Sequence, residues 1–82
     1  DKLSSELFVP SKNFGSYGIT VSNDLSDKNN PKFILEKNNN KYIFFENRNY
    51  FETNNKKTSF NGVVVYNGEE LFIPLNALEL IN

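Results

Sequence analysis

The C-terminal stretch of the chain decides the expected fold, and residues 61–82 read NGVVVYNGEELFIPLNALELIN. An Asn-Gly pair between two β-rich segments is a strong short-range signal for a hairpin, and here Asn67 and Gly68 separate residues 63–66 from residues 70–73. This stretch therefore predicts two antiparallel strands joined by a tight turn at 67–69.

The residues after this hairpin have the pattern of an amphipathic helix. Pro74 suits the first turn of a helix, and Leu75, Leu78 and Ile81 then recur on one helical face. We expect a helix over residues 75–81 that lies across one face of the sheet.

Two further hairpins precede this region. Residues 33–37 and 41–45 flank three asparagines at 38–40, and asparagine tolerates the left-handed backbone that tight turns require. Residues 50–53 and 58–60 flank a polar segment at 54–57 in a weaker version of the same pattern.

The N-terminal part of the chain is less regular. It predicts a strand at 6–10 ended by Pro10, a helical turn at 11–17 followed by Gly18, a β-branched strand at 19–21 and a polar loop at 22–31. All these elements together predict an α+β fold that is mostly β. We expect a twisted antiparallel sheet of about five strands packed around one C-terminal amphipathic helix.

A five-residue motif occurs twice in the chain. Glu6-Leu7-Phe8-Val9-Pro10 returns 64 positions later, from 6 to 70, as Glu70-Leu71-Phe72-Ile73-Pro74. Each copy is followed by a helix-like stretch, and such periods are typical of repeat proteins. We therefore expect residues 1–82 to form a single module that is one period of a repeat within a longer chain.

The composition excludes most enzyme chemistry. The chain has no histidine, cysteine or methionine, and so it lacks the usual general base at neutral pH, a thiol nucleophile and soft metal ligands. Its 9 basic and 10 acidic residues give a formal net charge of −1, which does not fit a nucleic-acid binder. No apolar run approaches the roughly 20 residues that span a bilayer. We expect no catalytic residue, no cofactor, no nucleic-acid partner and no membrane span.

The C-terminal stretch also resembles a known family. The hairpin at Asn67-Gly68, followed by Leu71-Phe72-Ile73-Pro74-Leu75 and the helix, resembles the copper amine oxidase N-terminal-like (stalk) domain. Leu7-Phe8-Val9-Pro10 looks like a preceding copy of the same hallmark, and residues 32–60 resemble the strands between two hallmarks. The resemblance implies an antiparallel sheet around one helix, in an extracellular or cell wall-associated protein of a Gram-positive bacterium. It implies no cofactor, because the copper of the family name belongs to another domain of the oxidase.

The central strands carry apolar residues on both faces. Alternation places Tyr42 and Phe44 on one face of the sheet and Ile43 and Phe45 on the other. One set belongs to the core under the helix. The other set is either part of a two-sided core covered by the polar loop, which is the preferred interpretation, or it contacts a neighbouring domain, a partner chain or a sugar. The expected core consists of Phe33, Leu35, Phe44, Val64, Phe72, Leu75, Leu78 and Ile81.

Three tyrosines are candidate ligand contacts: Tyr42, Tyr50 and Tyr66. A tyrosine ring can stack on a sugar or a peptide, and its hydroxyl group can form a hydrogen bond. Cross-strand packing within the hairpin explains Tyr66 equally well.

Three polar groups have both a functional and a simpler interpretation. The loop 22–31 holds the possible Ca²⁺ ligands Asn23, Asp24, Ser26, Asp27 and Asn29, but it lacks the glycine and final glutamate of an EF-hand, so we prefer a solvated loop. Glu69-Glu70 and Lys56-Lys57 are interpreted as exposed hairpin charges rather than as a catalytic pair and an anion site.

The sequence therefore predicts a non-catalytic structural or adhesive module that spaces or docks a neighbouring domain at the cell wall. The alternative is a carbohydrate- or peptide-binding domain that uses aromatic stacking and asparagine hydrogen bonds. The expected partners are neighbouring domains of the same chain and a cell-wall polymer or protein.

Overall fold

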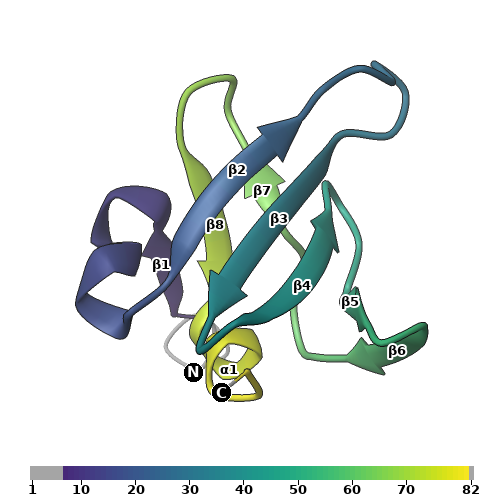
Figure 1. Ribbon diagram of the computed structural model, residues 1–82. Helices are drawn as coiled ribbons and strands as arrows, with labels where there is room; N and C mark the ends of the chain where they lie inside the picture. Colours follow the sequence, from purple (N-terminus) through teal and green to yellow (C-terminus); the bar gives the residue numbers. More distant parts are fainter. Residues whose placement is uncertain (1–6, 82) are drawn as a thin grey trace.

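The computed structural model describes residues 7–81, in which eight strands form two antiparallel sheets (Figure 1). In chain order the elements are β1 (Phe8–Pro10), the 3₁₀ helix η2 (Ser11–Tyr17), β2 (Thr20–Asp24), β3 (Lys32–Lys37), β4 (Asn40–Phe45), β5 (Tyr50–Thr53), β6 (Lys56–Ser59), β7 (Val65–Tyr66), β8 (Leu71–Pro74) and α1 (Leu75–Leu78). The larger sheet has the order β2-β3-β4-β5-β6, and the smaller sheet has the order β1-β8-β7. The predicted fold class is confirmed, since the chain is mostly β with one short C-terminal helix. The second sheet was not anticipated.

Asparagine pairs make both tight turns of the larger sheet. Asn38 and Asn39 have φ angles of 53° and 69°, and Asn54 and Asn55 have φ angles of 52° and 65°. Two consecutive residues with positive φ are what a two-residue hairpin loop of the favoured twist requires. Both predicted hairpins are confirmed, with shorter turns than expected, because Asn40 already belongs to β4 and the segment from Lys56 onward to β6.

The second strand is longer than its sequence indicated. β2 continues through Ser22 and Asn23 to Asp24, each paired with a residue of β3. These polar side chains are exposed at the edge of the sheet, which is why a strand can carry them. The expected loop at 22–31 is thus reduced to 25–31. It extends beyond the ends of β2 and β3 rather than over the sheet (Figure 1).

Backbone hydrogen bonds join the two sheets where β4 leads into β5. The Asn47 amide donates to the Val64 carbonyl over 2.8 Å, and the Val64 amide donates to the Arg48 carbonyl over 3.1 Å. The Phe60 amide donates to the Asn49 carbonyl over 2.8 Å. Segment 60–64 is thereby held against the larger sheet, and this contact sets where the β7–β8 hairpin begins.

The core lies between the two sheets and contains six aromatic side chains. The Phe44 ring contacts Phe51 at a centroid distance of 5.0 Å and Phe60 at 5.8 Å. The buried cluster comprises Val9, Phe14, Ile19, Phe33, Leu35, Tyr42, Phe44, Phe51, Phe60, Val64, Leu71, Ile73, Ala77, Leu78 and Ile81. Within residues 7–81 no polar or charged residue is buried. Full burial of a Val, Leu, Ile or Phe side chain contributes about 1.5–3 kcal/mol, so the residues of this cluster supply the main favourable contribution to the free energy of folding.

The predicted core is correct except at β8 and the start of α1. Six of the eight expected residues are buried, whereas Phe72 and Leu75 are only half-buried. In β8 the residues that face the core are Leu71 and Ile73, which are 2% and 0% exposed, so Phe72 lies on the opposite face. The sequence could not reveal which face of β8 meets the larger sheet, because both faces of this strand are apolar.

The outer face of the larger sheet carries the second set of apolar residues, as alternation predicted. Phe45 is buried there beside Tyr50, with ring centroids 5.5 Å apart, and Ile43 is half-buried. The Nζ atom of Lys57 lies 4.7 Å from the centre of the Tyr50 ring. Local contacts of this kind shield the outer face, and the end of the polar loop lies beside Phe45, since the Glu46 amide donates to the Pro31 carbonyl.

The predicted C-terminal helix is a single turn of α-helix followed by tighter turns. The Glu79 amide donates to the Leu75 carbonyl, and the amides of Leu80 and Ile81 bond to carbonyls three residues back. Ala77, Leu78 and Ile81 are buried, so this segment covers the core as expected. Neither α1 nor any other helix between residues 7 and 81 has the length and apolar character to cross a membrane.

Candidate binding crevice

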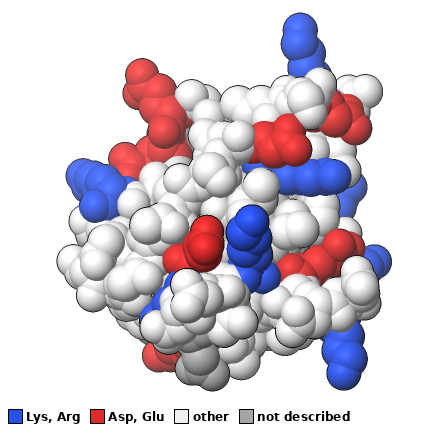
Figure 2. Space-filling view, viewed as in Figure 1, with Lys and Arg blue, Asp and Glu red and all other residues white. Residues whose placement is uncertain are grey.

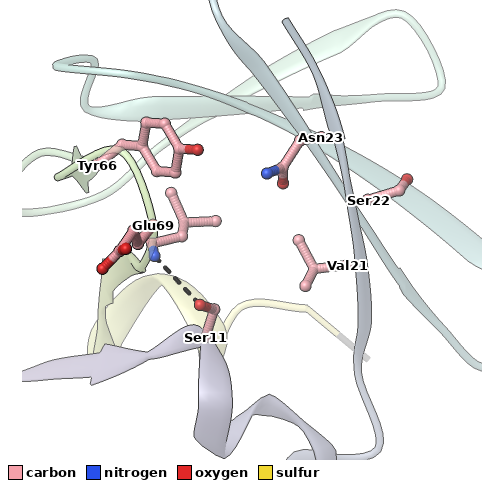
Figure 3. Close-up of a pocket in the computed structure, with 7 residues that line it drawn as sticks. Ser11, Val21, Ser22, Asn23, Tyr66 and Glu69 are labelled. Atoms are coloured by element: carbon pink, nitrogen blue, oxygen red, sulfur yellow. Dashed lines mark hydrogen bonds between the residues drawn. The ribbon is translucent and has the colours of Figure 1, made fainter.

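A polar crevice of about 320 Å³ lies between β2 and the β7–β8 hairpin. It is lined by Ser11, Val21, Ser22, Asn23, Tyr66, Glu69 and Leu71. β2 is the edge of the larger sheet and the hairpin belongs to the smaller one, so the crevice is the gap where the two sheets diverge. Figure 3 shows Tyr66 and Asn23 pointing toward each other from opposite walls, whereas Ser22 points away.

Tyr66 is held in place by contacts on both its ring and its hydroxyl group. The ring packs against Phe33 with centroids 4.9 Å apart and planes inclined at 51°. The hydroxyl group donates a hydrogen bond to the Gly68 carbonyl over 3.1 Å. The side chain is therefore ordered before any ligand arrives, which lowers the entropy cost of binding.

The turn that carries Tyr66 is built by Asn67. Its Oδ1 atom accepts hydrogen bonds from the amides of Glu69 and Glu70 over 2.9 Å and 2.7 Å, and Gly68 has a φ of 96°. The predicted Asn-Gly hairpin is thus confirmed. Its loop has four residues, and Asn67 acts through its side chain rather than through a left-handed backbone.

The floor of the crevice is fixed by Glu70. Its Oε2 atom accepts hydrogen bonds from the Lys12 amide over 2.8 Å and from the Ser11 hydroxyl over 3.3 Å. The Leu71 amide in turn donates to Ser11 Oγ over 3.1 Å (Figure 3). The interpretation of Glu70 as an exposed hairpin charge is therefore wrong, because its carboxylate caps the first turn of η2.

The chemistry of the lining suits a neutral polar ligand. The Asn23 amide can both donate and accept hydrogen bonds, whereas the hydroxyl groups of Ser11 and Tyr66 already donate within the fold and remain acceptors. Glu69 adds a carboxylate acceptor to the lining. Such groups match the hydroxyls of a sugar or the backbone of an extended peptide.

The three candidate tyrosines lie on different surfaces. Tyr42 is 7% exposed and belongs to the core, where it meets Phe51 edge-on at 5.7 Å, so its ring offers no face to an external ligand. Tyr50 is on the outer face of the larger sheet beneath Lys57. Of the three, Tyr66 lines the crevice. Sequence reasoning missed Ser11 as its neighbour, because the contact depends on the pairing of β1 with β8.

In the segment that the sequence predicted as a loop, Asp24 and Asp27 each accept hydrogen bonds from a residue two positions later. Asp24 Oδ1 accepts hydrogen bonds from the Ser26 hydroxyl and amide over 2.7 Å and 3.2 Å, and these bonds hold the pKa of Asp24 below its usual value. Asp27 Oδ1 accepts from the Asn29 amide over 3.0 Å. Across residues 7–81, groups of three or more His, Cys, Asp or Glu side chains that could share a metal ion do not occur.

A second hollow of about 280 Å³ lies between the two asparagine turns. Asn39, Asn40, Asn54 and Asn55 contribute to its lining together with Lys41, Ile43, Glu52 and Thr53. The Thr53 hydroxyl donates to the Lys41 carbonyl over 2.9 Å, which ties the two hairpins together. This hollow has no aromatic residue in its lining, unlike the crevice beside Tyr66.

Charges of both signs are interspersed on the surface. Figure 2 shows acidic and basic side chains alternating over the face seen in Figure 1, without a large area of one sign. Lys56 and Lys57 belong to the edge strand β6 rather than to a turn, and lysines on an edge strand discourage pairing with other strands.

Comparisons of the chain with protein-family models, with curated proteins and with solved structures found no match.

Proposed function

We propose that the chain is a non-catalytic docking module of an exported bacterial protein, which attaches a neighbouring domain to a cell-wall polymer or protein. The observation that supports docking over spacing is the position at which the chain enters and leaves the fold. The Leu75 amide donates to the Leu7 carbonyl over 2.7 Å, so the first described residue lies beside the start of α1.

This geometry makes the module a poor spacer. From Leu75 to Ile81 the chain makes tight helical turns, and six residues of helix advance about 9 Å. The longest dimension of the module is 37 Å. A chain that continued in both directions would therefore leave from one end, and the body of the module would project sideways from it (Figure 1).

The exported location rests on the resemblance of residues 61–82 to the stalk domain family. The proposal places the module outside the cell, at or near the wall of a Gram-positive bacterium. The composition agrees with a role in binding rather than in catalysis, because the chain has no histidine or cysteine to act as general base or nucleophile.

A second candidate function is a carbohydrate- or peptide-binding domain, and the crevice beside Tyr66 favours it. A preordered aromatic ring facing an asparagine across a polar gap can combine stacking with hydrogen bonding. In this case the ligand would be a defined oligosaccharide or peptide rather than a polymer surface.

Two measurements test these functions. Spin labels on Leu7→Cys and Leu80→Cys, at two exposed positions of a chain without native cysteine, report the distance between entry and exit. We expect a distance well below the 37 Å length of the module, and a distance close to that length would contradict the docking geometry.

The second measurement is a titration with peptidoglycan fragments, wall teichoic acid and a panel of extended peptides, followed by amide chemical shifts. Saturable shifts around Tyr66 that are lost in Asn23→Ala but kept in Asn29→Ala would assign binding to the crevice. Asn29 is a matched control because it is exposed on the loop outside the crevice. Saturable shifts elsewhere would favour docking through another surface, and no shift with any ligand would count against both functions.

A further inference from the structure

Residues 8–10 of the first motif copy pair with residues 72–74 of the second copy. β1 and β8 are antiparallel, and Val9 stands opposite Ile73, the same position of the motif. Phe8 faces Pro74 on one side of this pair, and Pro10 faces Phe72 on the other. The pairing is therefore nearly symmetric about the Val9–Ile73 pair, and the motif is complementary to a copy of itself.

The segment that carries the first copy is an N-terminal arm, residues 7–17, made of β1 and η2. Its hydrogen bonds to the rest of the fold include Leu7 with Leu75, Lys12 with Glu70, and Ser11 with both Glu70 and Leu71. Val9 and Phe14 insert into the core and are 6% and 1% exposed. The polar partners thus lie within residues 70–75, and a second copy of the chain offers the same set.

The arm joins the rest of the chain through a glycine hinge. Gly18 ends η2 in a left-handed conformation with φ of 73° and ψ of 26°, and a Cβ atom there would meet nothing within 4 Å. Glycine populates left-handed and extended conformations about equally, so this position can turn the arm back onto its own β8 or let it run on from β2.

We propose that β8 is a docking site for the β1 segment of a second copy of this chain, so that two chains exchange residues 7–17 and form a dimer. Each arm then makes on the partner the contacts that it makes on its own chain in the monomer. The contacts that an arm gains on the partner equal those it loses on its own chain, so monomer and dimer differ in free energy only through the hinge conformation and the entropy of association. The extent of exchange therefore depends on the protein concentration. It does not require a ligand in the crevice.

Disulfide trapping tests the exchange directly, because the chain has no native cysteine. Val9→Cys and Ile73→Cys variants, one of them carrying a longer tag, are mixed at high concentration, partly unfolded, refolded and oxidised. Opposed residues of an antiparallel pair have Cα atoms about 4.5–5.5 Å apart, within reach of a disulfide. We expect more of the covalent heterodimer, recognised by its intermediate mass, than random oxidation gives, because exchanged arms place position 9 of one chain opposite position 73 of the other. The double variant should close within one chain at low concentration and then remain monomeric at any concentration.

A hinge variant gives an independent measurement that needs no cysteine. Gly18→Ala makes the left-handed hinge of the monomer unfavourable. Each released hinge should favour the dimer about fivefold, and the two hinges together should raise the dimerisation constant about 25-fold. Gly15→Ala is the matched control, because Gly15 lies in the same helix without a positive φ and with open space at its Cβ. Mass measured by light scattering reports both variants. The proposal is overturned if the mixture yields no more heterodimer than random oxidation gives, or, where a cysteine variant does not fold, if Gly18→Ala stays as monomeric as Gly15→Ala.

Discussion

The docking of the last turn against the core can be tested by placing one charge at two neighbouring leucines. Leu78 is 4% exposed, whereas Leu80, two residues later, is 48% exposed. The same substitution, Leu78→Asp and Leu80→Asp, therefore compares a buried position with an exposed one on a single segment.

The magnitude follows from what the segment buries. A carboxylate at position 78 must either enter the core without a partner or release the segment that follows Pro74. Release exposes Leu78 and Ile81, each worth about 1.5–3 kcal/mol, and the smaller Ala77, for a total of about 4–7 kcal/mol. An 82-residue chain has a free energy of unfolding of roughly 4–12 kcal/mol, so the loss is comparable to the whole.

Urea unfolding and thermal melting, both followed by circular dichroism, provide the assay. We expect Leu78→Asp to be unfolded or to melt far below the unmodified chain, and Leu80→Asp to change the free energy of unfolding by no more than about 0.5 kcal/mol. Equal melting temperatures for the two variants would show that the turn after Pro74 does not cover the core.

Three further predictions concern polar groups. Glu70→Gln weakens the cap on η2 and should cost about 1 kcal/mol in urea unfolding, whereas Glu69→Gln, in the same turn, should change little; equal losses would contradict the capping role. Asn39→Ala should cost about 1 kcal/mol because alanine resists a φ of 69°, while Asn39→Gly should be neutral or stabilising, and the reverse order in a melting experiment would be incompatible with the turn geometry. The pKa of Asp24 is lowered from 3.8, so its contribution to stability is fully present above that value and is lost as the pH falls through the lowered pKa. A carboxyl NMR titration should show Ser26→Ala moving this pKa back up, and an unchanged pKa would argue against the Ser26 hydrogen bond as its cause.

Local signals in the sequence predicted most of the secondary structure. The polar segments at 38–40 and 54–57 indicated two hairpins, and the structure narrows each turn to an asparagine pair, because few other residues accept a positive φ at low cost. Alternation along β4 placed Tyr42 and Phe44 on one face of the sheet, and the structure shows that this face meets the core. These features depend on backbone conformations within a few residues, which the side chains concerned control directly.

The candidate site was predicted only in part. Tyr66 was identified from the sequence, but its crevice neighbours Ser11 and Asn23 were not assigned to it. Ser11 is 55 residues away from Tyr66 along the chain, from 11 to 66, and reaches the crevice only because β1 pairs with β8. Tyr42 was indistinguishable from Tyr66 as a candidate until its burial was known.

The sequence by itself determined where the three hairpins of this protein lie and that the chain has no histidine or cysteine. Only the tertiary structure decided that the eight strands of residues 7–81 divide into two sheets, that Leu71 and Ile73 rather than Phe72 face the core, and that residues 8–10 pair with residues 72–74. Turns are selected by the torsion angles of a few residues, whereas the choice of face and partner depends on which apolar surfaces meet. That choice depends on which apolar residues, far apart in the chain, become buried against one another.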